Sequence, residues 1–123
     1  MLKKVAFTMF PVDDTDRARA FYENTLGLKR GSSASNGVWT EYDLPGGGCL
    51  ALFNHPDPNA KGQRGTSNAS IAFEVEDLDQ AMADLKAKGV TFSSGIIKSP
   101  VCRMANINDS EGNSIILHEL HKK

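Results

Sequence analysis

The sequence has few cysteines and no long hydrophobic run. Its two cysteines, Cys49 and Cys102, have neither the spacing of a zinc knuckle nor the density of a disulfide scaffold, so we expect small buried side chains. The amino terminus lacks the apolar core and cleavage site of a signal peptide, and no run approaches the roughly 18 apolar residues of a membrane span. We therefore expect a cytoplasmic protein without a membrane partner.

The chain also lacks an excess of charge of either sign. Its 14 lysines and arginines are balanced by 15 aspartates and glutamates, for a formal net charge of -1. This balance provides no field that attracts a polyanion, so we expect no nucleic-acid partner. With 123 residues, of which 40% are hydrophobic and 24% charged, the composition is that of one globular domain with a single core.

An internal repeat divides this domain into two units. A shift of 63 positions pairs identical residues at Ala6 and Ala69, Phe10 and Phe73, Val12 and Val75, Asp14 and Asp77, Asp16 and Asp79, Ala18 and Ala81, and Ala20 and Ala83. Such self-similarity indicates two copies of one supersecondary unit. We assign residues 1–60 and 66–123 to the units and residues 54–68, which lack apolar periodicity, to a linker.

Each unit is predicted to contain a strand, a helix and then two or three further strands. The first strand alternates in its side chains, and an aspartate that can cap a helix follows it. Each helix is amphipathic and ends near a glycine, and the turns GGG and DSEGN join the later strands as hairpins. The predicted helices cover residues 15–25 and 78–88, and the predicted strands cover 4–10, 37–44, 48–54, 68–75, 101–107 and 113–119.

Three segments carry a family resemblance: VDDTDRARAFYENTLGL at 12–28, VEDLDQAMADLKAKGV at 75–90 and NDSEGNSIIL at 108–117. In this order they resemble the vicinal oxygen chelate superfamily, which includes glyoxalase I, extradiol dioxygenases, fosfomycin resistance enzymes and bleomycin-binding proteins. The third looks like the family's DPDGN turn, with Ser110 for proline and Glu111 for aspartate. The resemblance implies an α+β fold in which two βαβββ units form a curled mixed sheet around a cavity, and it implies a homodimer.

Strand alternation predicts which side chains line this cavity, because every second residue of a strand points to the same face. The more apolar set is assigned to the helices, and the other set faces inward. The inward set comprises Val5, Phe7, Met9, Trp39, Glu41, Cys49, Ala51, Phe53, Ser70, Ala72, Glu74, Ser114, Ile116 and His118.

Metal-dependent members of the family bind one divalent ion through four equivalent strand positions. The resemblance places these positions at Phe7, Ala51, Ser70 and Ile116. Divalent cations need carboxylate or imidazole ligands, and none of the four residues supplies one. We expect the four side chains to converge in the cavity, with no metal at this place and no cofactor.

The other inward residues supply candidate chemistry. The predicted catalytic residues are His118 for proton transfer and Glu41 or Glu74 as its partner; the same three residues would also be the ligands of a displaced metal. Arg103 has the opposite parity to Cys102 and is expected to be solvated or in a salt bridge. The predicted ligand-binding residues are Trp39, Phe7, Met9, Phe53, Ser70, Cys102 and Met104.

Three functions remain open on this sequence. The first is a binding protein of the bleomycin-resistance type, which holds a small organic ligand between its repeats without the family metal. The alternative is a lyase, isomerase or dioxygenase-type enzyme that acts on a small oxygenated substrate through His118 and a carboxylate or a displaced divalent metal. The third is an interaction module without a ligand. The first two are favoured because inward carboxylates and an imidazole are costly to bury without a ligand, water or partner.

Overall fold

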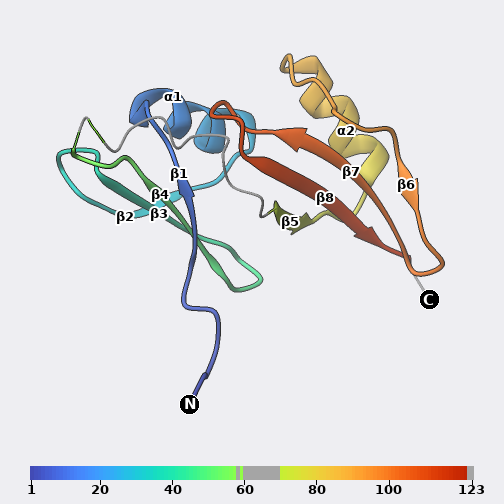
Figure 1. The fold of residues 1–123 in the computed structure, drawn as a ribbon. Coiled ribbons are helices and arrows are strands. Elements are labelled where there is room, and N and C mark those ends of the chain that lie inside the picture. Colours follow the sequence, from blue (N-terminus) through green and yellow to red (C-terminus); the bar gives the residue numbers. More distant parts are fainter. Residues whose placement is uncertain (58, 60–69, 122–123) are drawn as a thin grey trace.

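The computed structural model describes residues 1–57, 59 and 70–121, so most of the predicted linker lies outside the described residues. The eight strands form two four-stranded mixed sheets, with strand orders β1-β4-β3-β2 and β5-β8-β7-β6, which lie side by side in Figure 1. This is the α+β architecture expected from the repeat. In chain order the elements are β1 (Thr8–Pro11), α1 (Thr15–Ala20), η1 (Phe21–Thr25), β2 (Arg30–Ser33), β3 (Trp39–Asp43), β4 (Cys49–Phe53), β5 (Ser70–Glu74), α2 (Leu78–Ala87), β6 (Ile97–Lys98), β7 (Cys102–Asn108) and β8 (Ser114–Leu120).

Both sheets pair their strands in the same way. The first strand of each unit runs parallel to the last, with Phe10 opposite Leu52 and Phe73 opposite Leu117, and the remaining pairs are antiparallel. One face of each sheet packs against a helix. The buried side chains of this shared core include Phe10, Val12, Ala18, Tyr22, Tyr42, Leu50, Leu52, Leu78, Met82, Leu85, Ala105, Ile107, Ile115 and Leu117.

The helices begin and end as their sequences predict. Asp14 and Asp77 each accept a hydrogen bond of 3.0 Å from the amide three residues later, which caps α1 and α2. The first helix continues as the π-helical turn η1, where the amide of Leu26 donates to the carbonyl of Phe21 at 2.9 Å. Neither helix, nor any other in the described ranges, is long and apolar enough to cross a membrane.

Two details of the strand prediction were wrong. The first strand begins at Thr8 instead of residue 4, because its partner β4 begins at Cys49 and Thr8 already pairs with Leu50. The edge strands β2 and β6 were not predicted. All residues of β2 and β6 are exposed, so neither strand carries the apolar alternation that marks a half-buried strand.

The hairpin turns of the two units share the same two backbone hydrogen bonds. In the first, the amide of Leu44 donates to the carbonyl of Gly48 at 3.1 Å, and that of Gly47 donates to Leu44 at 3.0 Å. In the second, Asp109 donates to Asn113 at 2.9 Å, and Gly112 donates to Asp109 at 3.2 Å. Gly47 and Gly112 both have positive φ, at 100° and 85°, which only glycine adopts without strain. The turns differ in the side chains they carry and at one backbone position, because Gly48 has a φ of 92° and its counterpart Asn113 has no positive φ.

The β7–β8 turn connects the second unit to the first helix. The buried carboxylate of Glu111 accepts hydrogen bonds from the backbone amides of Asp13 and Asp14 at 3.1 and 3.2 Å. It also forms an ion pair of 2.5 Å with Arg17. The guanidinium of Arg17 lies over this turn because the buried carboxylate needs a positive partner.

A second buried hydrogen bond supports the same junction. The hydroxyl of Tyr22 donates to Asp109 at 2.6 Å, and the same carboxylate accepts the amides of Glu111 and Asn113 at 2.8 Å each. Burial, together with the negative charge of Asp109, raises the pKa of Tyr22 well above its usual value, so its proton stays in this bond. We call the contact of Glu111 and Asp109 with Arg17 and Tyr22 the turn clamp.

We predict that Glu111→Gln lowers the free energy of unfolding at pH 7 by about 1–3 kcal/mol, because it weakens hydrogen bonds to a buried group. Burial alone would raise the pKa of Glu111, but the hydrogen bonds from Arg17, Asp13 and Asp14 outweigh it and lower the pKa. The stabilisation is therefore present above the pKa of the unfolded state and is lost as the pH falls through the lower, folded value.

Urea denaturation at pH 7 and at pH 3 measures this difference. Glu76→Gln is the matched control, because Glu76 is the exposed residue at the place of Asp13 in the second unit. The control should change stability little at either pH. A Glu111→Gln penalty that stays the same at pH 3 would show that the charge of Glu111 contributes nothing.

Candidate functional site

Each sheet has one face that its helix does not cover. The first open face, on the β1-β4-β3-β2 sheet, carries Phe7, Met9, Trp39, Glu41, Cys49, Ala51 and Phe53. The second open face, on the β5-β8-β7-β6 sheet, carries Ser70, Ala72, Glu74, Met104, Asn106, Ser114, Ile116 and His118. These are the faces that strand alternation predicts to be inward, and the opposite sets are the ones buried under the helices.

Aromatic side chains gather on the first open face. The rings of Phe7 and Trp39 meet edge to face with centroids 5.3 Å apart, and Phe53 lies 6.1 Å from Trp39. Phe7 is 47% exposed and Met9 is 43% exposed, so large apolar side chains face solvent here. Three of the predicted ligand-binding residues thus form one surface, on which an apolar or aromatic ligand can stack.

Glu41 orients this aromatic surface. Its carboxylate accepts a hydrogen bond of 2.9 Å from the indole N–H of Trp39 and one of 3.4 Å from the thiol of Cys49. Met9 and Glu41 flank Ala51 across the sheet, and this leaves Ala51 fully buried although it belongs to the open face. The carboxylate fixes the indole in place and adds a negative charge beside it.

A histidine and a carboxylate meet on the second open face. Nδ1 of His118 lies 2.6 Å from Oε1 of Glu74, and Oε2 of Glu74 accepts the amide of Leu120 at 3.1 Å. The hydrogen bond from His118 lowers the pKa of Glu74, which keeps the carboxylate ionised. Within residues 1–57, 59 and 70–121, Nε2 of His118 has no hydrogen-bond partner. An imidazole held at Nδ1 with Nε2 free is arranged for proton transfer.

The other predicted site residues are placed differently. Met104 is paired with His118 across the sheet, and Ser70 forms a hydroxyl contact of 2.7 Å with Ser114. Cys102 is only 6% exposed, and its sulfur lies 3.1 Å from the hydroxyl of Ser99. The structure thus places Met104 and Ser70 on the second open face and Cys102 beneath the surface.

The four inherited metal positions fall in two pairs. Phe7 and Ala51 lie on the first open face, and Ser70 and Ile116 lie on the second, so their convergence stays a prediction about how the two faces meet. Glu41 and the pair of His118 and Glu74 also lie on separate sheets. Across the described part of the chain, no three His, Cys, Asp or Glu side chains are grouped closely enough to hold a metal ion.

Several polar contacts were outside the sequence prediction. Arg103 pairs with Glu119 at 3.0 Å and Asp79 at 3.2 Å, which agrees with the salt-bridge alternative. Arg19 donates to the hydroxyl of Thr40 at 2.9 Å. The turn clamp was also missed, although the NDSEGN segment that forms it was recognised. A signal was present, because a turn with two acidic residues followed a buried strand.

The chain was compared with known proteins. The model of the Glyoxalase/Bleomycin resistance protein/Dioxygenase superfamily matches residues 4–117. The uncharacterized protein YetH of Bacillus subtilis (strain 168) is 26% identical over 122 residues, which are 97% of this chain and 100% of YetH.

Two solved structures share the fold. A glyoxalase/dioxygenase from Nostoc punctiforme superposes with a TM-score of 0.79 at 19% identity, over 98% of this chain and 92% of that one. TnmS3, an antibiotic binding protein from Streptomyces sp. CB03234, superposes with a TM-score of 0.78 at 24% identity, over 98% of each chain. At these identities the likeness concerns the fold.

The environment of Cys49 leads to a prediction about thiol reactivity. Burial, reinforced by the hydrogen bond to Glu41, raises the pKa of Cys49 to about 11. In a Cys102→Ser background, alkylation of Cys49 by iodoacetamide should therefore be slow at pH 8 and should rise about tenfold per pH unit without a plateau below pH 10.

Mass spectrometry of the alkylated protein gives the rate. Glu41→Gln removes the negative charge beside the thiol, so it should lower the pKa of Cys49 and accelerate the reaction at pH 8. A plateau near pH 8 or 9 in the parent would mean that Glu41 and Cys49 are not in contact in solution.

Proposed function

We propose a function from the premise that the chain belongs to the Glyoxalase/Bleomycin resistance protein/Dioxygenase superfamily. The protein binds a small organic ligand on its open faces, without the family metal. The observation that carries the proposal is the exposed aromatic surface of Phe7, Trp39 and Phe53, with Glu41 fixed against the indole. An aromatic surface with one preset polar anchor is typical of small-molecule sites. The fold shared with an antibiotic binding protein supports the same reading.

The charges on the open faces indicate the class of ligand. Glu41 lies on the first face and Glu74 on the second, and the basic residue Arg103 lies on the helix side of its sheet, tied to Glu119. A phosphate or carboxylate ligand would require a basic cluster. We therefore propose a neutral or cationic ligand with an aromatic or apolar body.

We also propose that the protein acts as a homodimer. The two open faces belong to different sheets, and each exposes large apolar side chains to solvent, such as Phe7 and Met9 on the first and Ile97 beside the second. Exposed apolar surface of this kind favours association. In a dimer, an open face of one copy would meet an open face of the other and enclose the ligand.

The contact between His118 and Glu74 favours a second candidate, an enzyme that works by proton transfer on a small oxygenated substrate. In this scheme Nε2 of His118 takes a proton from the substrate, while Glu74 holds the Nδ1 proton and stabilises the imidazolium. The activity would be of the lyase or isomerase class. Elemental analysis of the purified protein distinguishes it from a metal-dependent reaction.

We predict that Trp39→Ala and His118→Ala each weaken ligand binding by about 1–3 kcal/mol, through loss of a stacking surface or a buried polar partner. Ligands are first identified by a thermal-shift screen of aromatic amines and neutral metabolites. Isothermal titration calorimetry then gives the affinities, with His121→Ala as control because His121 is exposed near the carboxyl terminus.

The same variants distinguish the binding protein from the proton-transfer enzyme when turnover is measured beside binding. Loss of turnover in His118→Ala with binding retained would support the enzyme, and loss of binding without any turnover in the parent would support the binding protein. If the folded Trp39→Ala and His118→Ala variants both bind as the parent does, the open faces are not the ligand site.

A further inference from the structure

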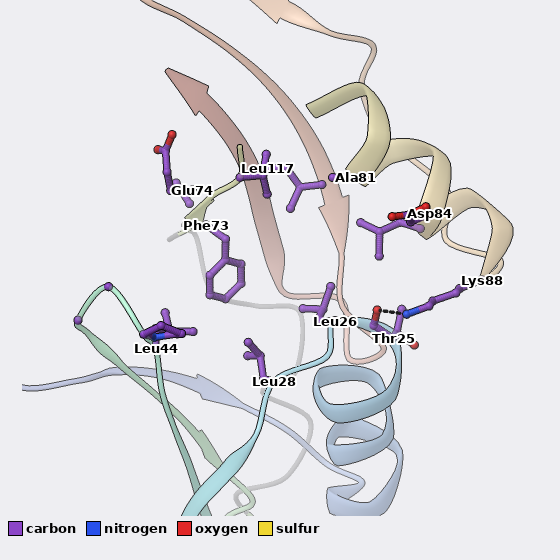
Figure 2. Close-up of a pocket in the computed structure, with 16 residues that line it drawn as sticks. Thr25, Leu26, Leu28, Leu44, Phe73, Glu74, Ala81, Asp84, Lys88 and Leu117 are labelled. Carbon is purple, nitrogen blue, oxygen red and sulfur yellow. Dashed lines mark hydrogen bonds between the residues drawn. The ribbon is translucent and has the colours of Figure 1, made fainter. Parts of the chain in front are cut away.

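We propose that the chain has a second small-molecule site, on the helix side of the β5-β8-β7-β6 sheet, which binds a compact aromatic or aliphatic amine. The site is a cavity of about 690 Å³ between the two units. Figure 2 shows it between the β3–β4 turn, the chain after η1, strand β5 and helix α2. It does not depend on the function proposed for the open faces.

The cavity exists because side chains fill the junction between a hairpin turn and a helix in one place and leave it open in the equivalent place. The β7–β8 turn fills its junction with α1 through Asp109 and Glu111, which reach Tyr22 and Arg17. The β3–β4 turn has the same two backbone hydrogen bonds and lines the cavity beside α2, but Leu44 and Gly46 stand at the places of Asp109 and Glu111.

Within residues 1–57, 59 and 70–121, the residues at the equivalent places do not form a second clamp. A Cβ added at Gly46 or Gly47 would meet no atom within 4 Å. On α2, Leu85 stands at the place of Tyr22, and Gln80, at the place of Arg17, bonds to Asp84 instead of the turn, at 2.8 Å. The counterpart of the turn clamp is therefore an open space, which a ligand can fill.

Apolar side chains line most of this space. Phe73 lies at its centre in Figure 2, near Leu26 and Leu28. Leu85 and Leu117 complete the apolar lining on the side of the second unit. The volume is within the range of about 300–1,000 Å³ that is usual for ligand pockets.

The charges at the rim favour an ammonium group on the ligand. Asp84 and Lys88 lie on α2 at the edge of the cavity. The ammonium of Lys88 is already engaged, because it donates to the carbonyls of Asn24 and Thr25 at 3.3 and 3.1 Å. These neutral carbonyls leave the positive charge of Lys88 in place, but the lining holds two carboxylates, Asp84 and Glu74, against this one ammonium, so the balance of charge favours a cationic ligand.

The cavity is separate from the open faces. Phe73 and Leu117 point to the helix side of their sheet, whereas Glu74 and His118, their neighbours in sequence, meet on the second open face. Strand β5 stands between the two places. Glu74 and Ala72 of the second open face also border the cavity, whereas Trp39, Glu41 and His118 do not line it, so substitutions at these three residues can separate the two sites.

Three probes with the same ring test the chemistry: 1-naphthylmethylamine, 1-naphthylmethanol and 1-naphthylacetate. Amide chemical shifts from two-dimensional NMR report where each binds. We expect saturable shifts at the turn of residues 44–47 and along residues 81–88 of α2, strongest for the amine and weakest for the acetate. Shifts confined to the open faces, no saturable shifts, or preference for the acetate would overturn the proposal.

Two variants of α2 provide a matched pair. Ala81 lines the cavity and Ala83 is exposed outside it, so Ala81→Trp should weaken the amine at least about tenfold and Ala83→Trp should leave it unchanged. Asp84→Asn should weaken the amine about two- to fivefold and leave the alcohol unchanged. Equal binding by the folded Ala81→Trp variant would show that the cavity is not the site.

Light scattering on the same variants tests whether a second copy of the chain, instead of an amine, occupies the cavity. If Ala81→Trp changes the molar mass in solution while Ala83→Trp does not, the cavity is an interface between copies of the chain and the proposal is wrong. Unchanged mass with lost amine binding supports it. Trp39 and His118 do not line the cavity, so their alanine variants should keep the amine-induced shifts at residues 44–47 and 81–88 of the parent, whatever happens to shifts on the open faces.

Discussion

The arrangement of this molecule depends on one buried carboxylate. Glu111 lies in the second unit, yet it accepts the backbone amides of Asp13 and Asp14 just before α1 in the first unit, 98 and 97 residues away in sequence. A buried carboxylate is stable only when its lone pairs are matched, and Arg17 and two amides match them here. Because these donors have fixed directions, the contact sets the orientation of the second unit as well as its position.

The turn clamp also explains why the two ends of the repeat behave differently. Tyr22 and Asp109 fill one junction with a buried hydrogen bond, whereas Gly46 and Gly47 place no side chain in the other. The repeated unit thus produces a hydrogen-bonded contact where the β7–β8 turn meets α1 and a cavity where the β3–β4 turn meets α2. The open faces, which lie on the opposite sides of the sheets, keep their own polar anchors in Glu41 and Glu74.

Much of the fold was predictable because its signals are local. The alternation in β5 and β8 correctly assigned Phe73 and Leu117 to the helix side and Glu74 and His118 to the open face. Parity left Glu41 and Glu74 as alternative partners of His118, and the parallel register of β5 and β8 is what places Glu74 opposite it. The strands β2 and β6 were missed because an exposed edge strand needs no apolar pattern.

The contacts that sequence analysis missed join distant parts of the chain. The polar residues of the NDSEGN turn suggest an exposed loop. Glu111 and Asp109 are nevertheless buried, because their partners lie in the other unit. The joint position of Phe7, Ala51, Ser70 and Ile116 depends on how separate sheets are brought together, which strand parity does not encode. Glu41 could be placed on a face, but its bond to Trp39 depends on side-chain rotamers.

The sheet topology has a consequence for the order of folding. Each β-hairpin, such as β3 with β4, closes over a few residues, whereas the parallel pairing of Thr8 with Leu50 closes a loop of about 40 residues, and the Glu111 contact spans 97. The entropy of loop closure grows with loop length, so contacts distant in sequence are favourable only after local structure has shortened the chain between them. The hairpins are thus the natural nuclei, and the contact that orients the two units is the natural last step.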